Sequence, residues 1–183
     1  LTTGGNNVAI GSGALLVATT AADNTAVGTL ALTANSSGTD NTAVGYAAGD
    51  AVTTGDANTF VGDNAGGATT TADNNTAVGA SALLVNSTGA TNVAVGTLSL
   101  GANTTAANNT GVGAYALRAN STGGSNTAVG YQALDGNTTA SYNTAVGTNA
   151  LYANTTGTPN TAVGYFALDS NTTAGNNTAV GYD

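Results

Sequence analysis

Polar and apolar residues alternate over a short stretch that recurs along the whole chain. The stretch reads Asn, Thr, Ala, Val, Gly and is first complete at residues 24–28, while altered forms such as the one at residues 58–62 fill the gaps. Its eleven copies are spaced by 17 residues without insertion or deletion. They begin at Asn7, Asn24, Asn41, Asn58, Asn75, Asn92, Asn109, Asn126, Asn143, Asn160 and Asn177. A short fixed period predicts a solenoid, in which each repeat is one coil of chain stacked on the last.

We number each repeat from its asparagine, position 1, to position 17. Position 2 is Thr except at Val8 and Val93, and position 4 is always Val or Ile. Because side chains alternate along a strand, positions 2 and 4 share one face. The exchange of Thr with Val, which has nearly the same shape, suggests that this face packs inward. Position 9 is Leu in eight of ten copies. The pattern therefore predicts a narrow core of Val and Leu columns.

Two segments of each repeat have the composition of short strands. They cover positions 1 to 4 and positions 11 to 14, the second being rich in Asn, Thr and Ser. No segment between glycines reaches the length of an ordinary helix. We therefore predict an all-β, parallel β-solenoid of about eleven coils spanning residues 1–183 as one repeat array. At about 4.8 Å per coil, the rod would be on the order of 50 Å long.

Stacking in register gives the repeated asparagines and glycines a structural cause. Amide side chains placed one above another can hydrogen-bond as a ladder. We predict such a ladder at position 1, with Asn24, Asn41, Asn58, Asn75, Asn126, Asn143 and Asn160 among its members. Position 5 is Gly in every copy, which predicts a corner where φ is positive or a side chain would clash. These turn glycines include Gly28, Gly45, Gly62, Gly79, Gly96, Gly130, Gly147 and Gly164.

Composition excludes several classes of function. The chain has nine Asp, one basic residue, Arg118, and a formal charge of −8, so nucleic acid and anionic membranes are poor partners. It has no Cys or His, and its Asp residues are scattered over the repeat. Acid-base catalysis requires a positioned pair, so we expect no enzyme, no cofactor and no metal site. Apolar runs are too short to cross a membrane.

The repeat resembles the head repeats of trimeric autotransporter adhesins. The pattern is clearest at residues 126–140 and 160–174, and residues 7–11 read Asn-Val-Ala-Ile-Gly, close to the Ser-Val-Ala-Ile-Gly of those heads. Similar arrays occur in phage tail fibres and bacterial surface fibres. The resemblance implies a left-handed β-roll with three chains side by side. It differs in period, because the adhesin repeats are typically shorter and more variable. We expect the chain to be part of a longer protein.

Association with copies of itself has a second motive, because one narrow roll buries little surface. Small residues at positions 3, 8 and 11 would allow neighbouring rolls to approach closely. The third and fourth coils are irregular: Gly49 and Gly66 replace Leu, and Phe60 replaces Ala at position 3. Phe60 either fills the missing Leu volume or faces outward as a contact between chains.

Two further patterns have alternative readings. Asn-x-Ser/Thr sequences recur at position 12, at Asn35, Asn86, Asn103, Asn120, Asn137, Asn154 and Asn171. They would carry glycans in a glycosylating host, or form a second structural ladder, which we favour. Four of the seven tyrosines share position 6, where they would cover a corner or bind glycans; these are Tyr46, Tyr131, Tyr165 and Tyr182.

The leading functional hypothesis is a structural fibre or adhesin segment. It would be an extracellular rod or head at a cell or virion surface that presents a binding element to a host surface or glycan. The alternative is a solenoid face that binds a ligand itself, either glycan or ice. For ice, positions 12 and 14 would point the same way and expose columns of Asn and Thr.

Overall fold

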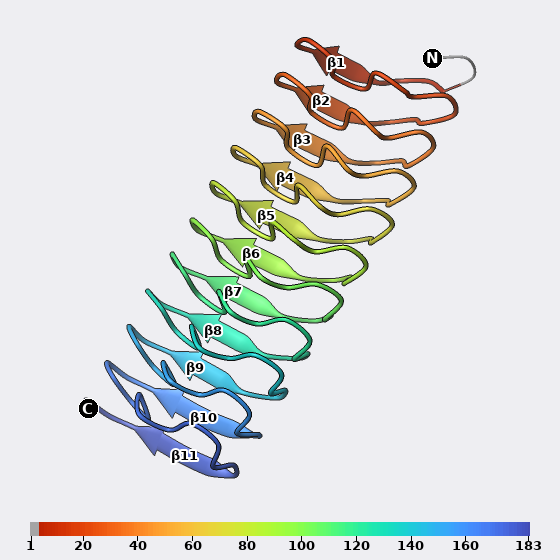
Figure 1. The fold of residues 1–183 in the computed structure, drawn as a ribbon. Helices are drawn as coiled ribbons and strands as arrows, with labels where there is room; N and C mark the ends of the chain where they lie inside the picture. Colours follow the sequence, from red (N-terminus) through yellow and green to blue (C-terminus); the bar gives the residue numbers. More distant parts are fainter. Residues whose placement is uncertain (1–3) are drawn as a thin grey trace.

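The structure, a computed structural model, describes residues 4–183. It confirms the parallel β-solenoid: one short strand from each coil joins a single eleven-stranded sheet in sequence order (Figure 1). The strands are β1 (Val8–Ile10), β2 (Thr25–Val27), β3 (Thr42–Val44), β4 (Thr59–Val61), β5 (Thr76–Val78), β6 (Val93–Val95), β7 (Thr110–Val112), β8 (Thr127–Val129), β9 (Thr144–Val146), β10 (Asn160–Val163) and β11 (Asn177–Val180).

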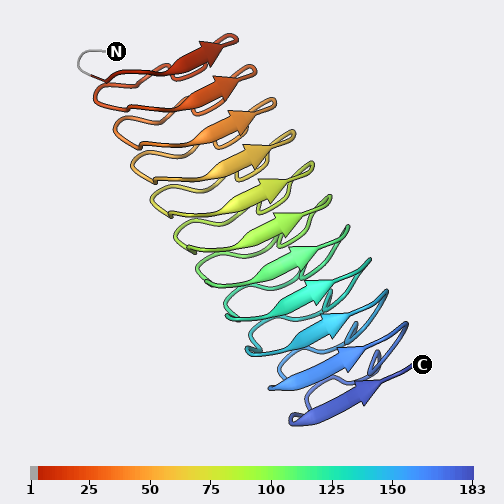
Figure 2. The same cartoon turned by 180° about the vertical axis from the view of Figure 1, so that it is seen from behind.

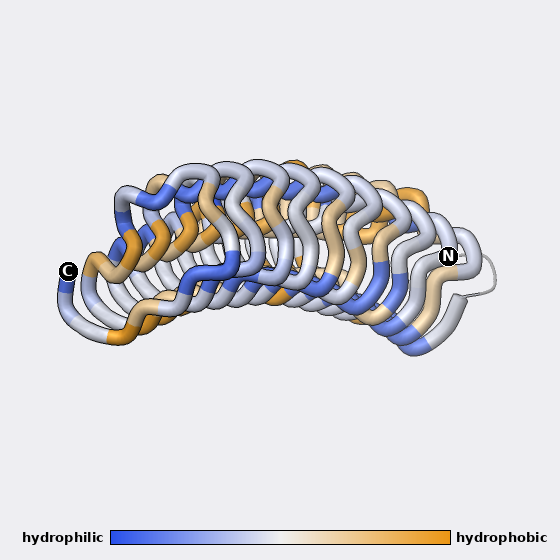
Figure 3. Tube along the Cα trace, turned by 90° about the horizontal axis from the view of Figure 1, so that it is seen from below, coloured by the Kyte–Doolittle hydropathy of each residue, from blue (hydrophilic) through white to orange (hydrophobic). Residues whose placement is uncertain are grey.

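Every strand pairs with the equivalent residues of the next coil. Thr25 lies opposite Thr42 and Val27 opposite Val44, and the same 17-residue offset holds through the last pair, β10 and β11. The stack is extended in both side views (Figures 1 and 2), and seen from below the coils show one flattened outline with hydrophilic bands recurring at the same place (Figure 3). Sheets with little twist over many strands are usually stabilised by side-chain ladders.

Each coil contains one strand, so the predicted second strand at positions 11 to 14 is wrong. Positions 6 to 14, which we call the return limb, consist mainly of turns and bends. Its leucines at position 9 have left-handed backbone conformations, with φ of +53° at Leu134. The N–H of Asn137 then donates to the carbonyl of Leu134 at 3.1 Å, which closes a turn. Left-handed residues interrupt an extended chain, so the return limb curls although it remains hydrogen-bonded to its neighbours.

The strand also faces the opposite way from the prediction. Ala at position 3 is buried, whereas Thr at position 2 and Val at position 4 point outward. Alternation indicated correctly that positions 2 and 4 share a face, but it could not say which face is inside. Leu from the return limb occupies the interior opposite the strand, which leaves room for only a methyl group at position 3. The core consists of Ala and Leu columns, with buried asparagines beside them.

Candidate functional surface

The position-1 asparagines form a continuous ladder inside the roll. In Asn41, the backbone N–H and the side-chain Nδ2 both donate to Oδ1 of Asn24, at 2.9 and 3.1 Å. Nδ2 also donates to the carbonyl of Gly55 at 2.7 Å, across the coil. The same pattern links Asn58 to Asn41. In these coils each amide therefore joins two coils and closes its own coil. At Asn143 the link to the neighbouring coils is made by the backbone N–H and Oδ1, and Nδ2 has no partner. The predicted members Asn24, Asn41, Asn58, Asn75, Asn126, Asn143 and Asn160 are all buried.

A second ladder of asparagines runs down position 12. Nδ2 of Asn137 donates to Oδ1 of Asn120 at 2.7 Å and to the carbonyl of Ala140 at 3.0 Å. Ala140 also accepts from Asn126 of the position-1 ladder, so the two ladders meet at one carbonyl. Six of these seven asparagines are fully buried: Asn35, Asn86, Asn103, Asn120, Asn137 and Asn154. A buried Nδ2 that already donates has no room for a sugar, so the structural reading holds for these six in the folded roll.

Hydroxyl groups at position 13 form a third ladder. Ser87 Oγ donates to the carbonyl of Thr104 at 3.0 Å, and Thr104 Oγ1 donates to the carbonyl of Ser121 at 3.1 Å. The pattern continues from Thr19 to Thr155, each hydroxyl reaching the next coil. These hydroxyls donate to the next coil and so link neighbouring coils. Position 12 points inward and position 14 outward, so the Asn and Thr face predicted for ice binding does not exist.

The position-5 glycines turn the corner after each strand with positive φ. The angle is +126° at Gly96 and +138° at Gly28. A Cβ on Gly96 would also lie 2.6 Å from the carbonyl carbon of Gly113 in the next coil. Both backbone conformation and close stacking therefore require glycine. The same region of positive φ is adopted by Gly28, Gly45, Gly62, Gly79, Gly96, Gly130, Gly147 and Gly164.

Phe60 fills the interior where two leucines are missing. Its side chain is fully buried, and a Cβ added to Gly49 would lie 2.7 Å from its ring. Gly66, at the same position of the next coil, borders the other edge of the ring. Of the two alternatives, the structure selects the repacked core. Phe60 cannot be the proposed contact between chains, because its ring does not reach the surface.

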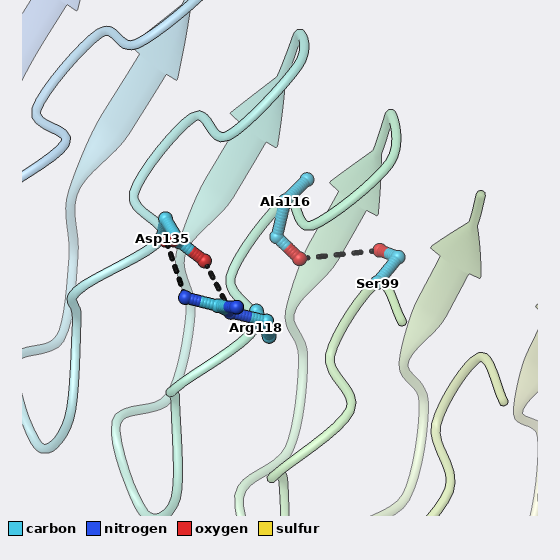
Figure 4. Close-up of polar contacts among 4 residues, drawn as sticks. All are labelled: Ser99, Ala116, Arg118 and Asp135. Carbon is cyan, nitrogen blue, oxygen red and sulfur yellow. Dashed lines mark hydrogen bonds and ion pairs between the residues drawn. The ribbon is translucent and has the colours of Figure 1, made fainter. Parts of the chain in front are cut away.

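One ion pair bridges two coils at position 10. Arg118 Nε lies 2.8 Å from Asp135 Oδ1, and its NH2 donates to Oδ2 at 2.9 Å (Figure 4). The guanidinium also lies 5.4 Å from the centre of the Tyr115 ring. Burial raises the pKa of Asp135, although Arg118 acts in the opposite direction. The sequence contained the signal for this pair, since opposite charges occupy the same position in adjacent repeats, but we did not predict it.

A buried exchange of volume lies beside this pair. Ser99 replaces Ala at position 8, and its hydroxyl donates to the carbonyl of Gly111 at 2.9 Å. It also lies 3.3 Å from the carbonyl oxygen of Ala116, to which it donates (Figure 4). Gly111 replaces Ala at position 3, and a Cβ there would lie 2.6 Å from the Ser99 hydroxyl. The larger residue is thus accommodated by a smaller one in the next coil.

The outer side of the sheet, which we call the strand face, consists of positions 2 and 4. It carries nine threonines and two valines at position 2, and Val or Ile at position 4. No charged residue occurs at positions 1 to 5 of any coil. Within residues 4–183, the position-2 hydroxyls make no hydrogen bond, unlike those at position 13. The threonines are Thr25, Thr42, Thr59, Thr76, Thr110, Thr127, Thr144, Thr161 and Thr178.

The position-6 tyrosines lie beyond the strand face, past the turn glycine. They are exposed, and Tyr165 stacks on Tyr182 with ring centres 5.2 Å apart. Tyr131 meets Tyr115 edge to face at 5.9 Å. These contacts connect neighbouring coils along one corner. Because position 6 is Tyr in four copies only, the column is discontinuous.

The described part of the chain has no cluster of metal-binding side chains. It contains no group of three or more His, Cys, Asp or Glu residues able to hold a metal ion. A hollow of about 530 Å³ lies at the C-terminal end of the stack, between Phe166, Leu168 and Tyr182. Across residues 4–183, no helix is long and apolar enough to cross a membrane.

Comparisons with known proteins leave the structure as the main guide. No family model, no curated protein and no solved structure matches this chain. The structure defines the class of protein as a repetitive β-solenoid. Ladders of amide and hydroxyl groups join its successive coils, and its sheet has one outer face without charged residues.

Proposed function

We propose that the chain is a rigid rod segment of an extracellular fibre or adhesin, which spaces or presents a binding element at a cell or virion surface. The observation that supports this most directly is the unbroken register of eleven coils, from Val8 opposite Thr25 to Val180 opposite Val163. Each coil is bonded to the next through strand, amide and hydroxyl contacts at once. Bending the rod would strain all of these together, so the array is suited to keeping a fixed length.

The resemblance to adhesin heads supports a left-handed roll and a side-by-side homotrimer. Of the small residues proposed for close approach, those at positions 3 and 8 are inside the roll, which leaves position 11. That column is mostly alanine and lies on the return limb, away from the strand face. The exposed surface gives no separate motive, because 7079 Å² is below the roughly 7,800 Å² typical of a monomer of this mass. The trimer proposal therefore rests on the resemblance and on position 11.

Two measurements on the purified chain test the proposal. Small-angle X-ray scattering should give a stiff particle on the order of 50 Å long, because eleven coils rise about 4.8 Å each. Native mass measurement should give three times 17.3 kDa. Ala102→Lys and Ala119→Lys, both at position 11, should dissociate the trimer. A compact or flexible particle in the scattering measurement would overturn the proposal of a rigid rod. A wild-type mass of 17.3 kDa would reject the trimer alone.

Protease accessibility tests the location. On intact cells or virions that carry the protein, an antibody against the repeat should bind without permeabilisation, and added protease should remove the signal. A signal that appears only after lysis would overturn the extracellular assignment.

A further inference from the structure

The threonines of position 2, most of which are half-buried, and those of position 14, which are exposed, differ in what surrounds them. Those at position 2 stand on a parallel sheet beside the valines of position 4, with no charge nearby in the strand. Those at position 14, such as Thr122 and Thr139, form one column at a bend, two positions before Asp56 and Asp73 in their coils, which share position 16. Only the strand face is therefore a regular, uncharged array in two directions.

The dimensions of this array are set by the backbone. Along the rod, neighbouring hydroxyls are separated by about 4.8 Å, the spacing of adjacent strands. Across it, position 2 and position 4 are separated by about 6.6 Å, two residues of an extended chain. The ladders at positions 1 and 13 hold this spacing because they connect every coil to the next. Threonine is β-branched and stiff at χ1, so its hydroxyl and methyl are held in place as well.

The chemistry of the strand face favours some kinds of ligand over others. A dry contact with another protein would bury position-2 hydroxyls that have no partner in the roll, at about 1–3 kcal/mol for each one left unpaired. A glycan site would require aromatic or charged side chains, and positions 2 and 4 of the strand face have none. A surface of ordered water offers both donors and acceptors to every hydroxyl and accepts the methyl groups between them.

We propose that the strand face binds ice. Threonine hydroxyls at position 2 join the water lattice by hydrogen bonds, and the methyl groups of positions 2 and 4 lie against the lattice between them. Each contact is weak, and binding results from repetition over a rigid array. The columns differ from positions 12 and 14, because the structure shows that position 12 is internal. This inference goes beyond the role of a rod and does not depend on it.

Matched lysine variants test the face. Thr110→Lys, Thr127→Lys and Thr144→Lys together place three charges on the strand face of adjacent coils. The control combines Thr122→Lys, Thr139→Lys and Thr156→Lys in the same coils at position 14, where the side chains are exposed. Thermal hysteresis and incorporation of labelled protein into a growing ice hemisphere are measured for wild type and both variants, with thermal melting to check folding.

Wild type and the position-14 variant should show thermal hysteresis and enter the ice, and the position-2 variant should lose both. Absence of both signals in wild type would overturn the proposal, as would their retention in the position-2 variant. If native mass shows an assembly that only the position-2 lysines dissociate, the face is an interface between copies and the proposal is wrong. These outcomes are separate from the rod, whose test is the length of the particle.

A milder variant keeps the test decisive if lysines disturb folding. Thr110→Val, Thr127→Val and Thr144→Val reproduce the residue already present at Val93 on this face. The shape and methyl groups are kept and only the hydroxyls are lost. Ice incorporation should fall while the melting temperature is unchanged. Unchanged incorporation would show that the hydroxyl column does not contact ice and would overturn the proposed mode of binding.

Discussion

The interior of two early coils, which begin at Asn41 and Asn58, is filled differently from that of four later coils, which together span residues 109–176. In the later coils, Leu at position 9 packs on a small residue at position 3, and Asn continues the ladder at position 12. In the earlier pair, the ring of Phe60 occupies the space of both missing leucines. The position-12 ladder is also interrupted there, by Val52 and Thr69.

The pairing of the backbone strands is unchanged where Phe60 replaces the leucines. Phe60 lies opposite Ala43 on one side and Ala77 on the other, in the same 17-residue register as every other strand. The position-1 ladder also continues unchanged through Asn41, Asn58 and Asn75. The comparison indicates that register depends on the strand and on position 1, whereas the filling of the core and position 12 can vary if volume is conserved.

The most severe test of volume conservation is Phe60→Ala. The free energy of unfolding should fall by about 3–5 kcal/mol, because Gly49 and Gly66 provide no atoms to fill the cavity. Denaturant unfolding followed by circular dichroism measures the loss. Gly49→Leu and Gly66→Leu added to Phe60→Ala would restore the pattern of the later coils and should recover most of it. Failure of this triple variant to regain stability would contradict the exchange of volume.

The two asparagine ladders should differ in cost. Asn126→Ala removes the acceptor of the Asn143 backbone N–H and should cost about 2–3 kcal/mol, because that group becomes unpaired inside the roll. Asn137→Ala removes side-chain links to Asn120 and Asn154 and one bond to the carbonyl of Ala140. That carbonyl still accepts from Asn126, and Asn154 keeps its bond to the carbonyl of Gly157. The cost of Asn137→Ala should be lower by about 1 kcal/mol. Equal losses in urea unfolding would argue against a special role for position 1.

The ion pair of the later coils provides a smaller effect. Arg118→Gln leaves Asp135, whose side chain is only 3% exposed, without its cation, and should lower the free energy of unfolding by about 1–2 kcal/mol. In an Asp135→Asn background, the same Arg118 change should have almost no effect, because no carboxylate remains to be paired. A double-mutant cycle, with unfolding by urea because urea is uncharged, measures the coupling energy between Arg118 and Asp135. A coupling energy of zero would show that the pair is only a surface contact.

Period and strand position could be predicted from sequence because they repeat in every coil. The position-1 asparagines and position-5 glycines followed from one column each, and stacking alone gives their cause. The direction of the strand could not be predicted, because alternation at Thr25, Ala26 and Val27 is equally consistent with either face inside. What decides it is the leucine of the return limb, which enters the same interior from the other side.

The second strand, at positions 11 to 14 of the return limb, was wrongly predicted for a related reason. Its Asn, Thr and Ser residues suit a strand, and nothing in the sequence shows that Leu134 adopts positive φ, a conformation uncommon for leucine. The volume exchange between Phe60 and the two glycines could be stated only as an alternative. Choosing between the alternatives required the direction of position 3, which the same ambiguity concealed.

The smallest expected effect compares the same position in the two regions. Asp50 in an early coil and Asp135 in a later one both occupy position 10, and burial raises the pKa of each above the ordinary 3.8. Backbone N–H groups oppose the shift at Asp50, and Arg118 opposes it at Asp135. The folded state therefore binds these protons more readily than the unfolded state, so each contribution is present below pH 3.8 and is lost as the pH rises through the raised pKa.

Urea unfolding at several pH values between neutral and about 3.8 measures this contribution. The free energy of unfolding should rise as the pH falls across that range, and the rise should be smaller in Asp50→Asn and in Asp135→Asn. Asp169→Asn, a change at position 10 of another coil, serves as the control for the loss of one charge. If all three variants reduce the slope equally, the cause is the total charge of the chain, and neither buried carboxyl has a role of its own.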